Sequence, residues 1–458
     1  MNLAAPVPPL PPHSLLVFLV AVVVLLLVAR LLGTVAERFG APAIVGELFT
    51  GVLLGPSLLG SVAPGIAGWL LPTDPHQFHL LDAVGQIGLL LLVGITGAHL
   101  DLGLLRRRTG AAVTVSVTGL VIPLALGVLL GLALPTAVTG QEGPDRPVFA
   151  LFLGVAMCVT AIPVIAKTLS DMRLLHRNIG QLTLAAGMVD DAVGWLLLSV
   201  VAAAATTGVS LGQVSLSVLY LVGFVLFAAT VGRFVVRRVM DRVARSGQSG
   251  PTVTAAVVIV LSGAVGTHAL GMEPVFGAFV AGLLLAPCRS SHALLGPLRT
   301  VVMAVLAPLF LAMAGLRMDL TALVDPQVAV TALGVLTVAI LGKFVGAYLG
   351  ARLTRLSPWE GLALGAGMNA RGVIEVIVAM TGLRLGVLNT ATYTTVILVA
   401  IVTSLMAPPL LRLAMAKVGQ TEDEELRRIE HDVWQARSVP SPDRGADPPP
   451  GEGGPDRT

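Results

Sequence analysis

Charged residues, aromatic residues and cysteine are all scarce in this chain of 458 residues. Charged side chains make up 12% of the sequence and aromatic side chains 4%, while 55% of the residues are hydrophobic. With a mean hydropathy of +0.89, these values describe a polytopic helical membrane protein rather than a soluble one. The two cysteines, Cys158 and Cys288, lie in apolar stretches, so they offer neither a disulfide framework nor a Cys-x-x-Cys metal site.

Apolar runs of membrane-spanning length recur along most of the chain. Short loops rich in glycine and proline separate them, and no loop is long enough to hold a soluble domain. The sequence therefore predicts an all-α polytopic membrane protein, in which residues 14–415 form one membrane domain with about 13 transmembrane helices. The predicted spans are residues 14–33, 41–60, 80–98, 110–134, 147–168, 179–206, 211–232, 252–270, 274–288, 298–316, 327–350, 359–383 and 391–414.

Basic residues alternate between loops in a way that predicts the orientation of the chain. Most of them lie in every second loop, whereas the opposite loops carry only Arg146, Arg317 and Arg384. Because basic loops stay in the cytoplasm, we expect residues 1–13 outside the cell and residues 419–458 as a disordered cytoplasmic tail. This spread of arginine, with so few aromatic residues, indicates a plasma-membrane protein and no nucleic-acid partner.

Two adjacent acids, Asp190 and Asp191, lie in a segment that is otherwise apolar over residues 180–205. The rise of a helix places them about 15–20 Å from the basic loop before them, near the membrane midplane. An ionisable side chain at that depth is costly unless something binds or pairs with it. Gly187 and Gly194, one turn away, are expected to leave open volume beside the carboxylates. We interpret the acid pair as an ion site.

Two basic residues, Lys343 and Arg371, lie inside predicted spans rather than in loops. Counted with the same helix rise per residue, Lys343, Arg371 and Thr160 all lie at the depth of the acid pair. Residues 158–163 and 365–372 combine proline or glycine with polar side chains, which predicts a break in each of these two helices. The broken spans occupy the same place in two blocks of five spans, a pattern typical of inverted repeats around a central substrate site.

Several short motifs lie in or near this predicted layer. They are residues 160–167 (TAIPVIAK), the Asp190-Asp191 pair, residues 341–346 (LGKFVG) and 368–375 (MNARGVIE), together with residues 44–47 (IVGE) and 55–60 (GPSLLG) nearer the start of the chain. Jointly they resemble the monovalent cation/proton antiporter superfamily, and most closely the branch shared by bacterial Na⁺/H⁺ antiporters and plant cation/H⁺ exchangers. The resemblance covers about residues 14–415. No glycine-rich dinucleotide fingerprint follows it, unlike in the nucleotide-regulated potassium-efflux members.

The resemblance implies a homodimer of 13-helix protomers, each with an ion-carrying core domain and a separate dimerisation domain. Two crossing broken helices lie at the centre of the core, and transport is an elevator-like alternating access. By position, Asp191 resembles the essential ion-binding aspartate of the family. Asp190 resembles the additional acid of its electrogenic members, with Lys343 as the salt-bridge partner. Thr160 is expected at the crossing of the two broken helices.

The expected function is electrogenic exchange of Na⁺ for protons, without a cofactor. Na⁺ prefers oxygen ligands, which Asp191 and Asp190 supply together with hydroxyl, carbonyl and water oxygens. Burial favours a neutral acid and a nearby cation favours a carboxylate, so one carboxylate binds either a proton or Na⁺ near neutral pH. If only the loaded carboxylate crosses, exchange is obligatory. When Na⁺ breaks the Asp190–Lys343 pair, Lys343 could release a second proton.

Two other transport functions stay open at this point. A K⁺/H⁺ antiporter would use the same carboxylates in a wider cavity, and a Na⁺-coupled organic anion symporter would use a similar inverted-repeat scaffold. An intramembrane aspartyl protease needs two acids that converge from different segments, whereas Asp190 and Asp191 are neighbours that point about 100° apart on one helix. The sequence therefore predicts a transporter and not an enzyme.

Some candidate residues also have a purely structural interpretation. Arg371 and Glu375 are four residues apart, so they either stabilise each other on one helix or lie on the ion path. Lys343 could simply fix two helices, and Glu47 could cap a helix or pair with an arginine. Trp195, on the face of the acid pair, is expected to be a packing residue. The predicted supporting polar core is Arg371, Glu375, Asn369 and Glu47.

Overall fold

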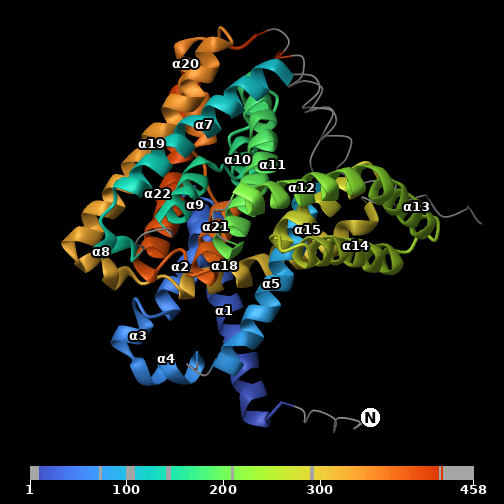
Figure 1. The fold of residues 1–458 in the computed structure, drawn as a ribbon, viewed down its shortest axis with the longest axis vertical. Helices are drawn as coiled ribbons and strands as arrows, with labels where there is room; N and C mark the ends of the chain where they lie inside the picture. Colours follow the sequence, from blue (N-terminus) through green and yellow to red (C-terminus); the bar gives the residue numbers. More distant parts are fainter. Residues whose placement is uncertain are drawn as a thin grey trace, which may run out of the picture.

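The structure, a computed structural model, describes residues 10–71, 75–98, 109–140, 146–207, 211–288, 293–421 and 424–425. Within these residues the regular secondary structure is helical throughout (Figure 1). Most of the predicted outer segment 1–13 and of the predicted tail therefore lies outside the described residues. The α-helices are α1 (Pro12–Arg38), α2 (Ala43–Leu54), α3 (Leu59–Val62), α4 (Pro64–Leu70), α5 (Pro75–Ala98), α7 (Thr109–Ala133), α8 (Thr136–Thr139), α9 (Arg146–Cys158), α10 (Ile162–Asp171), α11 (Asn178–Thr207), α12 (Leu211–Phe227), α13 (Arg233–Ala244), α14 (Ser249–Ala269), α15 (Pro274–Leu285), α17 (Gly296–Val301), α18 (Ala307–Leu316), α19 (Pro326–Leu353), α20 (Pro358–Met368), α21 (Val373–Arg384) and α22 (Thr390–Met415).

Ten helical stretches in the described part of the chain are long and apolar enough to cross a membrane. Together, α20 and α21 form an eleventh span, bent by 47° at the break between them. The predicted class, an all-α polytopic membrane protein, is therefore confirmed. The predicted count of about 13 spans is larger because it also includes the α9–α10 segment and α15, whose helices are shorter than a membrane-spanning helix.

Both helices predicted to be broken are broken in the structure. Residues 159–161 separate α9 from α10, and residues 369–372 separate α20 from α21. The two breaks contact each other, because the backbone amide of Ala161 donates to the carbonyl oxygen of Ala370 at 3.1 Å. Each break thus satisfies a backbone group that a continuous helix would have bonded internally.

Most of the spanning helices pack in two groups, which meet where α11 contacts α15, where α21 contacts α18 and where α22 contacts α2. The span formed by α12 and α13 contacts both groups, through α11 on one side and through α14 and α15 on the other. The α11 group consists of α7, α9, α10, α11 and α19 to α22, and the α5 group consists of α1, α2, α5, α14, α15 and α18. Figure 1 shows most of the α11 group in the upper left, with α5, α14 and α15 below and to its right. Glycine allows close packing in the α5 group: a Cβ on Gly277 of α15 would lie 2.0 Å from the carbonyl oxygen of Gly263 in α14.

Ion pairs join the two groups at both ends of the membrane domain. Lys167 of α10 binds Glu37 of α1 at 2.7 Å. At the other end, Arg384 in the last turn of α21 binds both carboxylate oxygens of Glu273, the residue that precedes α15. In the predicted orientation, the first pair lies on the cytoplasmic side and the second on the outer side. Any sliding of one group past the other must rearrange these contacts.

The beginning of α11 is held by the chain that follows α22. Arg177 forms a buried ion pair with Glu424 at 3.1 Å and donates to the carbonyl oxygens of Val418 and Gly419. The backbone amide of Asn178, the first residue of α11, donates to the other carboxylate oxygen of Glu424 at 2.6 Å. Glu424 belongs to the segment predicted to be a disordered tail, and these contacts hold it against α11.

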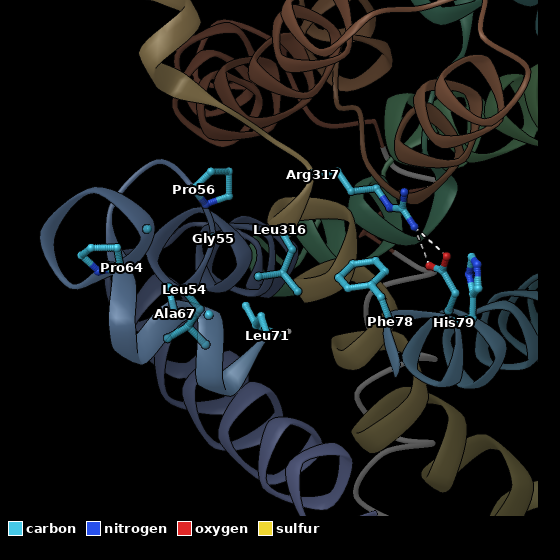
Figure 2. A pocket seen from close by; sticks show the side chains of 13 residues that line it. Leu54, Gly55, Pro56, Pro64, Ala67, Leu71, Phe78, His79, Leu316 and Arg317 are labelled. Atoms are coloured by element: carbon cyan, nitrogen blue, oxygen red, sulfur yellow. Dashed lines mark hydrogen bonds and ion pairs between the residues drawn. The ribbon is translucent and has the colours of Figure 1, made fainter. Parts of the chain in front are cut away.

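A cavity of about 620 Å³ lies where α5 begins and α18 ends, and α3, α4 and the end of α2 also line it (Figure 2). Its lining is largely apolar, and its two opposite charges already bind each other. Arg317 donates to both carboxylate oxygens of Asp82 at 2.7 Å and lies over the ring of Phe78, 5.2 Å from the centroid (Figure 2). Since these charges are already paired, this cavity does not resemble an ion site.

Candidate ion-binding site

Asp190 lies in the middle of α11 with none of its surface exposed, and three side chains bind its carboxylate. The hydroxyl of Ser116, from α7, donates to Oδ1 at 2.5 Å. The hydroxyl of Thr160, in the first helix break, donates to Oδ2 at 2.7 Å. Lys343 Nζ, from α19, completes the set with an ion pair to Oδ2 at 2.6 Å. The negative charge of Asp190 is therefore fully compensated by its neighbours.

Lys343 is also fully buried, and all three of its ammonium hydrogens have an acceptor. Besides Asp190, Nζ donates to the carbonyl oxygens of Gly119 at 2.9 Å and of Cys158 at 2.6 Å. The Cys158 carbonyl has no i+4 amide to accept from, because α9 ends at that residue. Lys343 thus binds an acid and the end of a broken helix at once. This arrangement suits a structural clamp as well as a group that couples to Asp190.

Thr160 lies where the two breaks meet, as the resemblance implies. Its hydroxyl is within hydrogen-bond distance of Asp190 Oδ2 and also of the carbonyl oxygen of Met368, at 3.1 Å. A hydroxyl carries one hydrogen, so it can donate to only one of these oxygens at a time. Any change in the charge of Asp190 can therefore be passed to the end of α20 through Thr160.

Asp191 is as deeply buried as Asp190, but its two carboxylate oxygens have no hydrogen-bond partner among the described residues. The backbone amide of Ile162, at the start of α10, interacts with it electrostatically outside hydrogen-bond geometry. Described side chains fill the open volume expected beside Gly187 and Gly194. A Cβ on Gly187 or Gly194 would lie 3.2 Å from the side chain of Ile162 or of Val159, respectively. These glycines instead let the first break pack closely against α11.

Arg371 lies in the second break and binds the end of the first broken helix. Its guanidinium donates to the carbonyl oxygens of Ala156 at 2.7 Å and Met157 at 2.6 Å, in the last turn of α9. It also forms an ion pair with Glu375 at 3.0 Å, the i, i+4 pairing that the sequence suggests. These contacts satisfy carbonyl groups that the end of α9 leaves free, and they favour the structural interpretation of Arg371.

Polar side-chain atoms in the second break and in the first turn of α21 remain unpaired within the described residues. Both polar side-chain atoms of Asn369 and one carboxylate oxygen of Glu375 are buried without a hydrogen-bond partner among the described residues. Each such group costs about 1–3 kcal/mol unless water or an ion binds it. Asn369 and Glu375 therefore supply further oxygen atoms in the same polar layer as Asp191.

Glu47, also predicted for the supporting polar core, lies elsewhere. It is buried in α2, and its side chain packs against α1 about 3.6 Å from where a Cβ on Gly33 would lie. Arg30 is a charged neighbour, although within the described residues the two form no ion pair. Glu47 thus belongs to the α5 group, and within the part of the chain that the structure describes it forms no hydrogen bond or ion pair with Asp190 or Asp191.

Ser116 donates a hydrogen bond to Asp190, and the sequence does not predict this contact. Ser116 lies in the predicted span of residues 110–134, which also contains Thr114 and Thr118. Those two hydroxyls bond to carbonyl groups of their own helix, whereas Ser116 donates across to α11. No feature of the sequence distinguishes a serine that bonds across helices from one that bonds within its own helix.

Replacing Arg371 with lysine should destabilise the protein by about 1–3 kcal/mol, because an ammonium cannot reach the several carbonyl groups that the planar guanidinium binds. The matched control is Arg238→Lys, at a position in α13 where the arginine lies over the ring of Phe234. Thermal unfolding in detergent measures both. An Arg371→Lys midpoint as close to wild type as that of Arg238→Lys would contradict the clamping role.

An all-α membrane domain in which two broken helices meet beside buried acids has the architecture of a secondary transporter. Residues 13–417 match the family described as "Sodium/hydrogen exchanger, transmembrane". Since the match covers most of the chain, the protein belongs to this family of monovalent cation/proton antiporters. It is a transporter and not an enzyme, as predicted.

Individual relatives agree with this assignment. The chain is 31% identical over 87% of its length to the Na(+)/H(+) antiporter NhaS4 of Synechocystis, covering 97% of that protein. It is 28% identical to the Na(+)/H(+)-K(+) antiporter GerN of Bacillus cereus, covering 86% of this chain and 95% of that one. Cation/H(+) antiporters of Arabidopsis thaliana also match, and this chain spans about half of their length. The predicted resemblance is thereby confirmed.

The fold is shared with a solved structure. The sodium proton antiporter MjNhaP1 from Methanocaldococcus jannaschii superposes with a TM-score of 0.66. The superposition covers 89% of this chain and all of that chain, at 17% sequence identity. At this identity the likeness establishes the fold alone, which is that of an all-helical polytopic membrane protein.

Proposed function

We propose that the protein is an electrogenic Na⁺/H⁺ antiporter in which Asp191 binds either Na⁺ or a proton. The observation that carries this proposal is that Asp191 is fully buried with no hydrogen-bond partner among the described residues. A carboxylate in that position is stable only with a cation or a proton on it. Na⁺ is a hard cation that takes oxygen ligands, and the carboxylate provides two.

The charges around the two breaks support a monovalent substrate. Asp190 is paired with Lys343, and Glu375 is paired with Arg371. Among the acids and bases of this layer that the structure describes, Asp191 is left with one negative charge. One Na⁺ or one proton neutralises it, but not both. If the α11 group crosses only when Asp191 carries one of these ions, the two ions are exchanged obligatorily.

A second proton is proposed to come from Lys343. The ion pair of Lys343 with Asp190 lies one residue from Asp191, so Na⁺ bound between the two acids competes with the ammonium for Asp190 Oδ2. Once separated from Asp190, a buried ammonium loses its proton readily. Release of this proton together with the one from Asp191 moves two protons for each Na⁺. The exchange is then electrogenic.

The proposed architecture follows the predicted 13 spans, with the α9–α10 segment and α15 counted as crossing the membrane. The α11 group serves as the core domain that carries the ion, and the α5 group as the dimerisation domain of a homodimer. The two broken spans, α9–α10 and α20–α21, are the corresponding parts of two inverted repeats. The protein lies in the plasma membrane with its N-terminus outside and its C-terminus in the cytoplasm, and the core moves like an elevator.

K⁺ is the alternative cation. The relative from Bacillus cereus is named as an antiporter of both Na⁺ and K⁺, and identities near 30% leave the choice of cation open. The carboxylate of Asp191 can serve either ion, and the size of the surrounding cavity selects between them. A Na⁺-coupled organic anion symporter is less well supported, because the buried lysine and the family match both favour proton exchange.

Purified protein in sealed liposomes with an internal pH dye tests the proposal. An outward proton gradient is imposed, and Na⁺, Li⁺, K⁺ or an organic anion is added outside in separate arms. We expect Na⁺ to change the dye signal at the lowest concentration, and liposomes without protein to give no signal. A response to K⁺ alone would replace Na⁺ with the alternative substrate, and a response to the organic anion alone would contradict antiport.

A further inference from the structure

Three buried polar side chains lie at intervals of four residues along α11. They are Asp191, Trp195 and Ser199, and each has at least one polar atom without a hydrogen-bond partner among the described residues. Residues four apart share one face of a helix. The unpaired atoms are the carboxylate oxygens, the indole nitrogen and the serine hydroxyl. Since an unpaired buried polar group is unfavourable unless water or an ion binds it, three in line on one face indicate a route for water and ions.

The same face of α11 continues to a cavity. Ala202 and Thr206, one and two turns beyond Ser199, line a cavity of about 350 Å³. At 1.5 Å per residue, Ala202 lies about 16 Å along α11 from Asp191. The row of unpaired polar atoms therefore fills the distance between the cavity and the proposed ion site. In the predicted orientation, the cavity is on the outer side of the membrane.

This face of α11 lies at the boundary between the two helix groups. The ring of Trp195 contacts Phe279 of α15, with 5.9 Å between the ring centroids. The Glu273–Arg384 ion pair, which also joins the two groups, lines the same cavity. Relative movement of the groups therefore changes the packing along the whole face and the contact at its outer end together. A route at such a boundary can open and close without any helix unfolding.

We infer that this face of α11 is the outer half of the ion path, with Ser199 as an intermediate oxygen ligand for the cation. The inference rests on the proposed function and deepens it. The indole N–H of Trp195, which has no acceptor among the described residues, is available to a water molecule on this path, while the ring packs on Phe279. The Glu273–Arg384 ion pair closes the outer end. The ligand is a monovalent cation that has lost part of its hydration shell. Along the path, the Ser199 hydroxyl and waters bound to the protein take the place of the lost hydration oxygens.

Cysteine labelling in sealed liposomes tests this path, in a background with Cys158→Ala and Cys288→Ala. We expect Ser199→Cys to react with a cationic methanethiosulfonate reagent added outside, and Na⁺ to protect it. Leu198→Cys is the matched control, because Leu198 is equally buried at the same depth on a different face of α11. It should stay unlabelled. Arg384→Gln, which removes the outer ion pair, should speed the labelling of Ser199→Cys.

Transport kinetics provide the second readout. Ser199→Ala should raise the KM for external cation about tenfold while changing kcat little, because one oxygen ligand of an intermediate site is lost. If Ser199→Cys stays unlabelled like Leu198→Cys, or if Ser199→Ala leaves the KM unchanged, the path lies elsewhere. Exchange by these variants would then still support the proposed function. Exchange that persists when Asp191 is neutralised would instead overturn the proposed function itself.

Discussion

Asp191→Asn abolishes cation/proton exchange and leaves the fold intact: this is the expected result of the most direct test. Asparagine has the shape of aspartate but neither binds a proton near neutral pH nor carries the charge that attracts Na⁺. Because the native carboxylate accepts no hydrogen bond from the described residues, its loss breaks no hydrogen bond that stabilises the fold. Proteoliposome exchange should fall to the level of protein-free liposomes, and the unfolding midpoint in Na⁺-free detergent should stay equal or rise.

Thermal unfolding also separates binding from transport. A ligand that binds only the folded state stabilises it by about 2.7 kcal/mol at a hundred times its dissociation constant. Na⁺ should therefore raise the unfolding midpoint of the wild type and not that of Asp191→Asn. Asp82→Asn is the control, because Asp82 is paired with Arg317 in the α5 group. It should keep the response to Na⁺. Residual exchange or a retained Na⁺ response in Asp191→Asn would mean that another group binds the cation.

The broken helices could be predicted from sequence because their signals are local. A proline and a threonine around residues 158–163, and closely spaced glycines before Arg371, favour a break wherever they occur in an apolar span. Helix rise alone places Lys343 at the depth of Asp190, since both distances are counted from basic loops. The depth of a residue in the membrane and the position of a helix break each depend on a single segment. Both can therefore be predicted without knowing how the helices pack.

The partners of each polar group could not be predicted, because they depend on which helices meet. Ser116 and Thr114 look alike in sequence, yet only Ser116 reaches Asp190. Glu47 is a buried acid near a family-like motif, but it lies in α2 against α1 and away from the contacts of Asp190. The space expected beside Gly194 is filled by Val159 of the first break. Each of these outcomes is set by tertiary packing, which the pattern of a single segment does not predict.

Lys343→Met is expected to destabilise the protein by about 3–5 kcal/mol, because Asp190 is then a buried charge without its cation. Methionine fills the space of the lysine stem but cannot bind the carboxylate or the carbonyl oxygens of Gly119 and Cys158. Adding Asp190→Asn should recover most of this loss, since a buried ion pair replaced as a unit costs little. The unfolding midpoints of the two single variants and the double variant measure the coupling between the two side chains.

The same double variant decides whether Lys343 carries a proton. With Asp191 intact, Asp190→Asn/Lys343→Met should still exchange the cation for a proton, now one for one. Its rate should no longer respond to membrane voltage set by an ionophore for an ion that the protein does not carry, whereas the wild-type rate should respond. If the double variant keeps the wild-type voltage response, the lysine only clamps α19 to α11 and the first break. If neither the wild type nor the double variant responds to membrane voltage, the exchange is electroneutral, and Asp191 alone sets the stoichiometry.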